Sequence, residues 1–457
     1  MDVQARSLSR EQLWALALGA IVLLGLVLRL KGIANPILDH PGWRQGDTAA
    51  IARNFAVLRY NPFFPQTDYN GPPPNYVELE LQIVPFLAAT LDKLFGVHVI
   101  FGRLITIAFS LGTIATLAFF GRWLFQSALA GLAAALLFAI DPGSVYYGRT
   151  FTPDTTMVFF ATVATFVASR YWLEDPRRSW SGVAVAGLLT LAAFLAKPVA
   201  LVILVPILAV AGARHRDKLA AMPQFWFYLA VSLLPLFAYL RFENAIAEWH
   251  WASGITKLHV IPDLAHALAS PARLIGKFRL TADTLGMLAS TMLGPAGFAL
   301  ALLGFIVPLR AKAPLLLPAW AVAMAAYAFA VVTVERVDYY LYLCIPLGAL
   351  AGGAFLAWLA EALAWRTMTP ASQRLLAASA CVAFLFTVYE NHLEVKGYYL
   401  YNRAVYRAAK RLDAALAPNA FVVMGHYDPS VLYYINRKGW EEDPYLWTPF
   451  DLSLIHI

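Results

Sequence analysis

The chain has 457 residues, of which 60% are hydrophobic and only 14% are charged, and its mean hydropathy is +0.61. A soluble protein would carry about 25% charged residues, so the composition excludes an ordinary water-soluble fold and predicts an all-α polytopic membrane protein. The net charge of +7 requires no nucleic acid as partner, because the arginines cluster between apolar runs as orientation signals do. The two cysteines, Cys344 and Cys381, both lie within apolar runs, so we expect neither a disulfide nor a thiolate metal site.

The apolar runs predict about 11 transmembrane helices, because about 20 apolar residues cross a bilayer. In chain order they lie near residues 13–30, 103–121, 127–141, 155–172, 182–197, 198–213, 225–241, 285–309, 314–334, 340–364 and 375–389. The first run lacks a small-residue cleavage site, so we expect a retained span. Residues 80–96 are short and end in Asp92-Lys93, and we interpret them as an interfacial helix. We expect residues 182–213 to form two short spans that turn at Lys197-Pro198.

The basic connections between these runs predict the orientation of the chain. Together with the N-terminus they define a positive, cytoplasmic side; they contain Arg122, Arg170, Arg177, Arg178, Arg214, Arg216, Lys218, Arg310, Lys312, Arg366 and Arg374. The opposite, external face then receives residues 31–102, 142–154, 242–284 and 335–340 and the tail after residue 390.

Two domains follow from this scheme. Residues 1–390 form the transmembrane domain, with 31–102 as the first external loop, and residues 391–457 form a small external α/β tail. The tail contains an amphipathic helical pattern, a turn at Pro418-Asn419 and one convincing strand, FVVMG. A lone strand does not make a stable sheet, so the tail is minimal, packed on the membrane part, or cut short.

The segment WRQGDTAAIARNF, residues 43–55, follows the first span and carries Arg44, Asp47 and Arg53. A carboxylate flanked by cations on a loop at a membrane face suits a polar reaction on a lipid-borne substrate, which makes the chain an enzyme candidate. The alternative is that Asp47, which follows a glycine and begins a helical pattern, only caps a helix.

Asp154 and Lys197 are also candidates for the external face. Pro153 and Asp154 begin a span, which suits the helix dipole alone, but Arg149 on the same loop favours a functional role. Lys197 lies deeper in an apolar run than snorkelling requires, and an ionisable residue there is a functional-site hypothesis by default. The alternative is a structural ion pair between Lys197 and an acidic loop residue.

Three further polar segments lie at this face. Glu78 and Glu80 in NYVELELQ are either site residues or solvated loop charges. The segment ERVDYYLYLCIP either belongs to the site or supplies an interfacial aromatic belt; it contains Arg336, Asp338, Tyr339 and Tyr340. One loop either covers a site or lines a lipid entrance; it contains Trp249, His250, Trp251, Lys257 and His259.

The order of these segments carries a family resemblance. Across residues 39–346 the chain shows DHPGWRQGDTAAIARNF, LDKLFGVHVIFGRLITIAFSLGT, GRTFTPDTTMVFF, LAKPVAL and DYYLYLCIP. This order resembles the lipid-linked-sugar glycosyltransferases of the GT-C superfamily, in the branch with the dolichyl-phosphate-mannose protein O-mannosyltransferases and the aminoarabinose transferase of lipid A. Those enzymes have an acidic residue and two interfacial helices in the first external loop. An R-x-x-x-x-D segment, a lysine-proline turn and a YY-x-x-x-x-x-P span follow.

The resemblance implies a GT-C fold with Asp47 as catalytic base, Asp154 as second acid of the site and Lys197 near the donor phosphate. The substrate-binding residues then include Arg44, Glu78, Glu80, Arg149, Arg336, Asp338, Tyr339 and Tyr340. The chain departs from its relatives in having VELELQ after the proline loop and Val337, in place of histidine, before DYY. The identity of the acceptor is therefore left open.

The chemistry of such a transfer sets its own requirements. Cations must hold the departing phosphate, and Lys197, Arg149 and Arg336 are available for this role. A single displacement inverts the anomeric centre and needs one carboxylate as base, without the nucleophilic carboxylate of retaining hydrolysis. A divalent cation (Mg²⁺, Mn²⁺ or Ca²⁺) shared by Asp47 and Asp154 is left open. No other cofactor is expected.

The sequence thus predicts an inverting transfer from a polyprenyl-phosphate sugar to a lipid, glycan or protein acceptor, among membrane lipids. We expect the active site on the periplasmic or extracellular face of a bacterial plasma (inner) membrane. A rival class is a transporter or flippase of lipid-linked sugars, which would show an inverted repeat, broken spans and charges near the midplane. A third possibility is a non-catalytic binding subunit that kept the fold.

Overall fold

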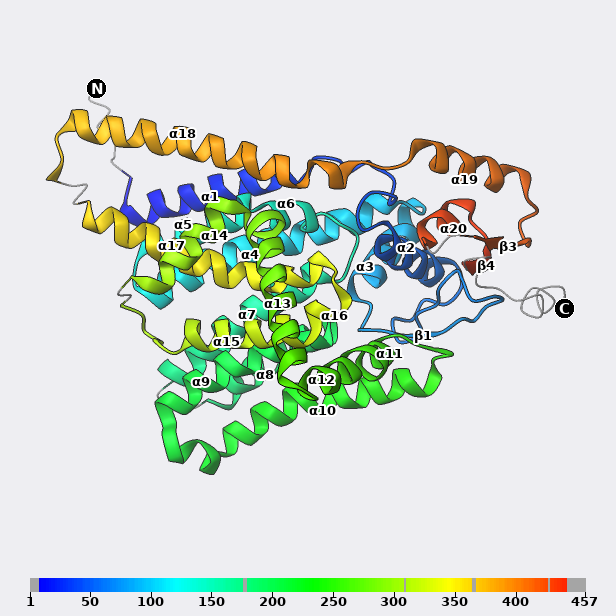
Figure 1. Cartoon of the computed structure of the whole chain (residues 1–457), viewed down its shortest axis with the longest axis horizontal. Helices are drawn as coiled ribbons and strands as arrows, with labels where there is room; N and C mark the ends of the chain where they lie inside the picture. Colours follow the sequence, from blue (N-terminus) through cyan, green and yellow to red (C-terminus); the bar gives the residue numbers. More distant parts are fainter. Residues whose placement is uncertain (1–7, 176–178, 308–309, 364–366, 426–427, 442–457) are drawn as a thin grey trace, which may run out of the picture.

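The computed structural model describes residues 8–175, 179–307, 310–363, 367–425 and 428–441. Within them the chain forms an elongated bundle of helices, with two small parallel sheets and several short helices at one end (Figure 1). The long helices run side by side, so the bundle has two ends. Both sheets lie at the same end of the bundle.

Within the described residues, eight helical segments are long and apolar enough to cross a membrane. They are α1 (Arg10–Arg29), α4 (Val99–Phe125), α7 (Asp154–Glu174), η1, α9 and η2 (Pro198–Ala221), α10 (Pro223–Ile246), α15, η5 and α16 (Leu316–Glu335), η6 and α17 (Asp338–Ala362), and α18 with the helices after it (Pro370–Ala415). Two shorter apolar helices, α5 (Ala128–Ile140) and α8 (Trp180–Ala196), and one bent pair complete the bundle. The predicted apolar runs are therefore helical, apart from a break within 285–309, and the chain is a multi-pass membrane protein.

Helix boundaries in the bundle coincide with capping residues. At the start of α1, Ser9 Oγ accepts from the amide of Gln12, while the Gln12 side chain accepts from the amide of Ser9 at 2.8 Å. This reciprocal capping box satisfies two amides that would otherwise lack partners. At the starts of α8 and α18, the side chains of Ser179 and Thr369 likewise accept from a backbone amide of the first turn. Local chemistry thus sets where these spans begin.

The predicted span at 285–309 is not one straight helix. The helical run of α13 (Pro271–Met287) and η4 (Leu288–Met292) meets α14 (Gly294–Ile306) at 118°. Gly294 has φ +72°, a conformation that favours glycine, and the proline that follows cannot donate an amide hydrogen bond. The expectation of a continuous span was wrong because hydropathy does not report this glycine-proline break.

The basic connections that the structure describes share one end of the bundle, as predicted, while Arg177, Arg178 and Arg366 lie outside the described residues. Arg122 at the end of α4 pairs with Glu11 in the first turn of α1, with Nη2 and Oε1 2.6 Å apart. Lys312, just before α15, pairs with Glu174 at the end of α7, with Nζ and Oε1 2.7 Å apart. These pairs lie at the end of the bundle opposite the sheets (Figure 1).

The opposite end contains the first loop and the tail. Its elements are α2 (Gly42–Val57), β1 (Val77–Glu78), α3 (Ile83–Phe95), α6 (Pro142–Tyr147), β2 (Trp249–His250), α11 (Ala252–Gly254), η3 (Ile255–Val260), α12 (Ile261–Leu268), η8 (Lys396–Tyr399), α19 (Arg403–Ala415), β3 (Phe421–Met424), α20 (Pro429–Ile435) and β4 (Lys438–Glu441). Helices α2 and α3 pack against each other and are too short to cross a membrane. The interpretation of residues 80–96 as an interfacial helix agrees with α3.

The tail has a second strand that the sequence did not indicate. Strands β3 and β4 pair in parallel, from Phe421 with Lys438 to Met424 with Glu441, and α20 connects them. The expectation of a single strand was wrong because β4 contains lysine, glycine and glutamate, which are poor strand formers. A Cβ on Gly46 of α2 would lie 2.4 Å from the amide nitrogen of Ser430 in α20. The tail is therefore packed closely on the membrane part.

Glycines allow the central spans to approach each other. A Cβ on Gly304 of α14 would lie 2.0 Å from the carbonyl oxygen of Ala351 in α17, and one on Gly131 of α5 would lie 2.1 Å from that of Ala118 in α4. Small residues permit such close backbone contact between helices in lipid, where packing drives association.

We predict that Gly304→Ala lowers the thermal unfolding temperature of the purified protein, because overpacking a close helix contact costs about 1–3 kcal/mol. Gly276→Ala is the matched control, since a Cβ at this glycine of α13 meets nothing within 4 Å. It should be neutral or stabilising, because alanine favours helix by up to about 1 kcal/mol. Equal effects of the two changes would contradict the packing argument.

Candidate active site

Asp47 lies on α2, which begins at Gly42 after Pro41. The residue is well inside the helix, so the interpretation of Asp47 as an N-cap was wrong. Its side chain is 3% exposed, and Oδ1 has no hydrogen-bond partner among the described residues. A buried carboxylate oxygen without a partner is costly, which favours a functional role over a structural one.

The surroundings of Asp47 shift its titration toward neutrality. Burial raises the pKa of Asp47 to about 7, since the charged form loses its hydration. Arg44 and a hydrogen bond with Tyr69 oppose this rise, while Asp428 and Asp68 add to it. A carboxyl group with a pKa near 7 is suited to accept a proton in catalysis.

Arg44 lies one turn before Asp47 and connects it with other acidic groups. Its Nη2 forms an ion pair with Glu80, and both residues are buried. Burial lowers the pKa of Arg44, but attraction by Glu80, Asp47, Tyr339 and Asp154 outweighs it and the pKa is raised. Asp47 and Asp154 therefore both act on the same guanidinium, which places the two predicted acids in one electrostatic cluster.

Lys197 lies between α8 and η1, where the predicted turn at Lys197-Pro198 is confirmed. Its Nζ is 2.6 Å from Oδ1 of Asp154, the first residue of α7. The same Nζ lies 4.4 Å from the ring centre of Tyr340 and 5.2 Å from that of Tyr339. Oδ2 of Asp154 has no partner among the described residues. Lys197 thus forms an ion pair, and its partner is a second predicted site residue.

A cavity of about 440 Å³ lies beside this cluster. Its walls are mostly aromatic and include Trp43, Tyr69, Trp249, Trp251, Tyr339 and Tyr340. Tyr69 contacts Asp47, and Tyr339 and Tyr340 contact Lys197. Neither Asp47 nor Asp154 lines the cavity. Asp47 lies behind Tyr69, and Asp154 lies behind Lys197, which itself contacts the wall at Tyr339 and Tyr340. Trp249 and Trp251 place the loop after α10 in the wall of this cavity.

Glu78 has a different environment from Glu80. Its Oε2 accepts from the amide of Ser253 at 3.1 Å and from the hydroxyl of Ser253 at 2.6 Å, and it lies 3.7 Å from Nδ1 of His250. Glu78 is 3% exposed, so the alternative of a solvated loop charge was wrong. It holds the loop after α10 against the first loop, where β1 and β2 pair.

Asp338 belongs to a separate hydrogen-bonded group. It accepts from the hydroxyl of Tyr147 at 2.6 Å and from that of Tyr398, and it lies 3.3 Å from Nε2 of His40. The neighbouring Arg336 is exposed at the end of α16. The structure therefore brings Tyr339 and Tyr340 to the cluster, but not Asp338 or Arg336.

Arg149 is also outside the cluster. Its Nη2 is 2.7 Å from Oδ2 of Asp39, and Nη2 of Arg103 is 2.9 Å from Oδ1 of the same carboxylate. The three side chains are 0% exposed. The assignment of Arg149 as a phosphate ligand is therefore corrected. Its guanidinium is already paired with Asp39, and solvent does not reach this pair. Hydropathy gave no signal for this pairing, since Asp39 and Arg149 are far apart in the sequence.

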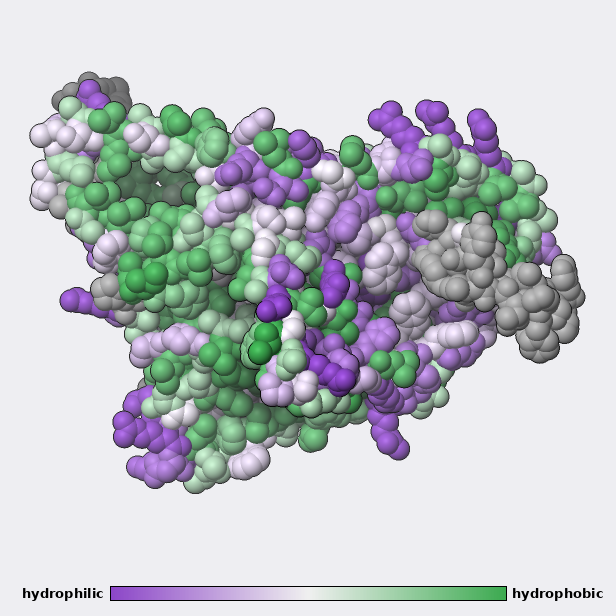
Figure 2. All heavy atoms as spheres, in the orientation of Figure 1, coloured by the Kyte–Doolittle hydropathy of each residue, from purple (hydrophilic) through white to green (hydrophobic). Residues whose placement is uncertain are grey.

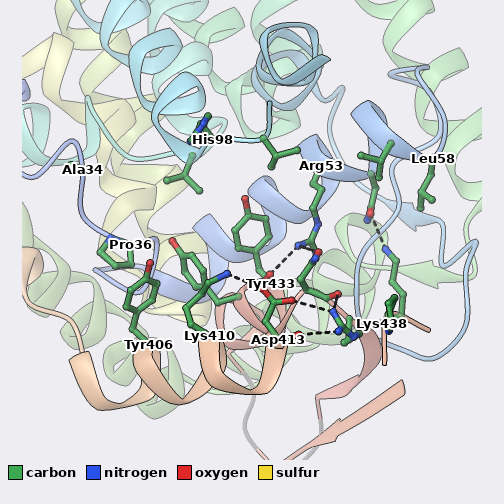
Figure 3. Close-up of a pocket in the computed structure, with 18 residues that line it drawn as sticks. Ala34, Pro36, Arg53, Leu58, His98, Tyr406, Lys410, Asp413, Tyr433 and Lys438 are labelled. Atoms are coloured by element: carbon green, nitrogen blue, oxygen red, sulfur yellow. Dashed lines mark hydrogen bonds and ion pairs between the residues drawn. The ribbon is translucent and has the colours of Figure 1, made fainter. Parts of the chain in front are cut away.

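Arg53, which flanks Asp47 in the sequence, also points elsewhere. It lies in a cavity of about 880 Å³ between α2, the start of α4 and the tail (Figure 3). Its guanidinium pairs with Asp68 and donates to the carbonyl oxygen of Tyr433 at 2.9 Å. Lys438 pairs with the same Asp68 at 2.7 Å. These contacts connect the tail to the first loop.

Two residues that sequence reasoning missed complete the cluster. Tyr69 contacts Asp47, and Trp43 forms part of the cavity wall. Aromatic residues near a membrane surface are common, so their type alone gives no signal. Trp43 is the exception, because it lies beside Arg44 in the segment that carries Asp47.

Comparisons with known proteins give one family match and similar folds. Residues 82–240 match the sequence model of a family described as dolichyl-phosphate-mannose-protein mannosyltransferase. The matched part contains Asp154 and Lys197 but not Asp47. A comparison with curated protein sequences gives no match.

Two solved structures have a similar fold. ArnT from Cupriavidus metallidurans, bound to undecaprenyl phosphate, has a TM-score of 0.63 at 16% identity, over 93% of this chain and 85% of that one. The oligosaccharyltransferase of Archaeoglobus fulgidus has a TM-score of 0.60 at 13% identity, over 95% of this chain and 65% of that one. The predicted resemblance to the GT-C superfamily is confirmed, and the chain has an ArnT-like GT-C fold with a small extramembrane α/β segment.

We predict that Asp39→Ala lowers stability strongly, because it leaves two buried arginines without their shared counter-ion. Removal of one partner from a buried ion pair costs about 3–5 kcal/mol. Thermal unfolding of the purified protein measures the change. Glu11→Ala is the control, since the pair of Glu11 with Arg122 is at the surface, where ion pairs contribute little. A similarly small effect at Asp39 would contradict the assignment of this network as structural.

Proposed function

We propose that the protein is a membrane glycosyltransferase that moves a sugar from a polyprenyl-phosphate donor to an acceptor hydroxyl or phosphate, with inversion. The observation that carries the proposal is the buried Asp47 carboxylate, with a pKa near 7 and an oxygen without a partner, behind an aromatic cavity. Among the similar structures, ArnT is bound to undecaprenyl phosphate and the archaeal oligosaccharyltransferase is in complex with a dolichol-phosphate, which supports a lipid-phosphate donor.

Lys197 and Arg44 are the cations suited to the donor phosphate. The ammonium of Lys197 can donate three hydrogen bonds, and one of them reaches Asp154. The remaining donors can bind phosphate oxygens through charge-assisted contacts. Arg44 takes the place that Arg149 and Arg336 had in the sequence-based hypothesis, because it lies between Asp47 and Glu80.

Asp47 is proposed as the general base. The acceptor hydroxyl loses its proton to Asp47, and its oxygen bonds to the anomeric carbon of the sugar. The bond from that carbon to the phosphate oxygen breaks, and polyprenyl phosphate leaves with its charge balanced by Lys197. This single displacement inverts the anomeric centre and requires no nucleophilic carboxylate.

Asp154 is proposed to position Lys197, since the two groups form a direct ion pair. Oδ1 of Asp47 and Oδ2 of Asp154 are the oxygens left for a divalent cation, should one take part. Among the residues that the structure describes, no group of three or more histidine, cysteine, aspartate or glutamate side chains is arranged to hold a metal. The proposed steps require only side chains of this chain.

The aromatic cavity is proposed to hold the sugar or its acceptor. Binding sites are usually lined by aromatic groups with a few polar side chains that fix orientation. Here Glu335, Glu441, His250 and His259 supply the polar edges, and the described lining contains neither lysine nor arginine. This lining favours a hexosyl or pentosyl group without a carboxylate over an acidic sugar.

The alternative is a transporter or flippase of lipid-linked sugars. The break between η4 and α14 favours it, because transporters use broken helices at their binding sites. Asp154 and Lys197 instead lie at the ends of spans, and Asp47 lies on the short helix α2 of the first loop, which favours an enzyme. A non-catalytic binding subunit is the third possibility, and turnover by the purified protein separates the enzyme from the other two.

We predict that Asp47→Asn lowers sugar transfer from a radiolabelled polyprenyl-phosphate sugar by about 10²–10⁴-fold, the range typical of general-base loss. Expression and unfolding temperature should persist, because Asp47 caps no helix. In the wild type, activity should fall as the pH drops below about 7, since the protonated carboxyl cannot accept a proton. Asp283→Asn, at an exposed position of α13, is the control. Unchanged turnover in Asp47→Asn would reject the base.

A second prediction concerns Lys197. Lys197→Met should lower both donor binding and stability, because it leaves Asp154 buried without its partner, at a cost of about 3–5 kcal/mol. The double variant Lys197→Met/Asp154→Asn should regain stability but not donor binding, since the phosphate contact stays lost. Equilibrium binding of the labelled donor and thermal unfolding measure the two effects. Recovery of donor binding in the double variant would assign Lys197 a purely structural role.

A third prediction concerns the face of the membrane. With the N-terminus cytoplasmic, a thiol introduced by Asn419→Cys should react with an impermeant reagent added outside whole cells, because Asn419 is exposed in the tail. Lys218→Cys should react only after permeabilisation, and Cys381→Ala removes the exposed native thiol. The reverse pattern would place the candidate site in the cytoplasm. In the first loop, a thiol at position 67 would not serve this labelling, because Thr67 is buried, with 1% exposed.

A further inference from the structure

We propose that a membrane glycerophospholipid with an anionic headgroup binds between α1 and α18. Its phosphate contacts Lys31 and His392, and an acyl chain lies in the groove between the two helices. This lipid is distinct from the sugar donor, and the proposal does not depend on the proposed transfer reaction.

The groove is a cavity of about 380 Å³. Its apolar lining comes from α1, from the junction of α5 and α6, and from α18, and includes Leu28, Ile140, Val145, Leu385 and Val388. Figure 2 shows a hollow beside the first part of α18, and the groove lies further along this helix, at Leu385 to Val395. The two helices thus leave a lateral gap lined by apolar side chains.

Helix α18 leaves most of its apolar surface without protein contacts. None of the residues in its hydrophobic window is buried, and Leu385 and Phe386 are 66% and 63% exposed. The contacts of α18 with the bundle are with α6, α14 and η4, near its C-terminal end. An empty groove would forfeit the dispersion contacts that close packing provides, so an acyl chain is the occupant that this lining fits.

A cationic group closes one end of the groove. Nζ of Lys31 lies 3.0 Å from Nε2 of His392 and 4.7 Å from the ring centre of Tyr399. Lys396 follows at the end of α18. Among the described residues, neither Lys31 nor His392 forms an ion pair with a carboxylate. The positive charge is therefore available to an anion.

The position of this charge matches the depth of lipid phosphates. Lys31 lies just beyond Arg29, the last residue of α1, and His392 lies in the last turn of α18. Both are at the span ends nearest α2 and α3 (Figure 1). Basic side chains at the end of a span lie at the headgroup level and attract anionic lipids. Charge complementarity thus favours an anionic phospholipid over a zwitterionic one.

A buried layer separates this groove from the candidate active site. The ring of Tyr399 lies 4.7 Å from both Lys31 Nζ and the guanidinium of Arg149, and Arg149 is held by Asp39. None of the residues that line the groove also lines the aromatic cavity. A phosphate on Lys31 therefore lies on the far side of this layer from α2, so the groove suits a resident lipid rather than the reacting donor.

Native mass spectrometry of the purified protein tests the proposal. After exchange into nanodiscs of phosphatidylcholine with a minor fraction of phosphatidylglycerol, the wild type should retain phosphatidylglycerol after release. The double variant Lys31→Gln/His392→Gln should retain about five-fold less, because the charge of Lys31 near the headgroups contributes about that factor. Lys93→Gln, at an exposed position of α3, is the control and should behave as the wild type does. Equal retention by the double variant would overturn the proposal.

The acyl chain and the identity of the lipid are tested separately. Val388→Trp fills the groove without a change of charge, and it should also release the lipid; unchanged retention would overturn the assignment of the acyl chain. It serves as the second variant if the charge variant does not fold, which thermal unfolding shows. Added polyprenyl phosphate should leave phosphatidylglycerol in place, whereas its displacement would assign the groove to the donor and overturn the proposal. None of these readouts requires turnover.

Discussion

The architecture of the external end depends on one carboxylate between two buried arginines. Asp39 receives Arg103 from α4 and Arg149 from the segment before α7, and it also accepts from the side-chain amide of Gln45 on α2 at 2.8 Å. Three charges with no solvent exposure are tolerated only because they neutralise and hydrogen-bond one another. Since Gln45 lies two residues before Asp47, this network fixes the helix that carries the proposed base to two spans of the bundle.

The tail supports the same helix from the other side. Backbone of α20 approaches Gly46 so closely that a side chain there would collide with Ser430. Asp68 holds Arg53 and Lys438, and these pairs connect α2, the first loop and β4. Burial alone would raise the pKa of Asp68, but the two cations lower it below its ordinary value. Asp47 lies between the two supports and has no such ion pair. The pKa of Asp68 therefore falls, whereas that of Asp47 rises.

In the candidate site, the cations are paired with carboxylates, whereas two carboxylate oxygens have no partner among the described residues. Lys197 with Asp154 and Arg44 with Glu80 are paired, so the cations are held in place without a substrate. One oxygen of Asp47 and one of Asp154 are left over. Such a site is preorganised, because a phosphate and a hydroxyl can be received by groups that already have fixed positions. The aromatic wall with Tyr69 and Tyr340 excludes water from these groups, which strengthens each interaction.

The sequence by itself determined the features that depend on how favourably each segment of the chain transfers from water to lipid. The apolar runs became helical apart from the break within 285–309, residues 80–96 became the short helix α3, and the connections with Arg122 and Lys312 gathered at one end. These outcomes follow from the hydropathy of each segment and need no knowledge of its neighbours. The ordered motifs also indicated the GT-C fold, because their spacing records the order of the spans.

Tertiary structure alone decided which charges meet. Arg149 pairs with Asp39 across 110 positions, and Lys197 with Asp154 across 43, so no local pattern distinguished the buried structural arginine from the lysine of the candidate site. The same holds for Asp47, whose raised pKa arises from burial by distant elements. The break at Gly294 and the strand β4 depend likewise on close approach to Asn391 and pairing with β3. A charge or a short strand is stabilised by whatever the fold places beside it, and that is a long-range property.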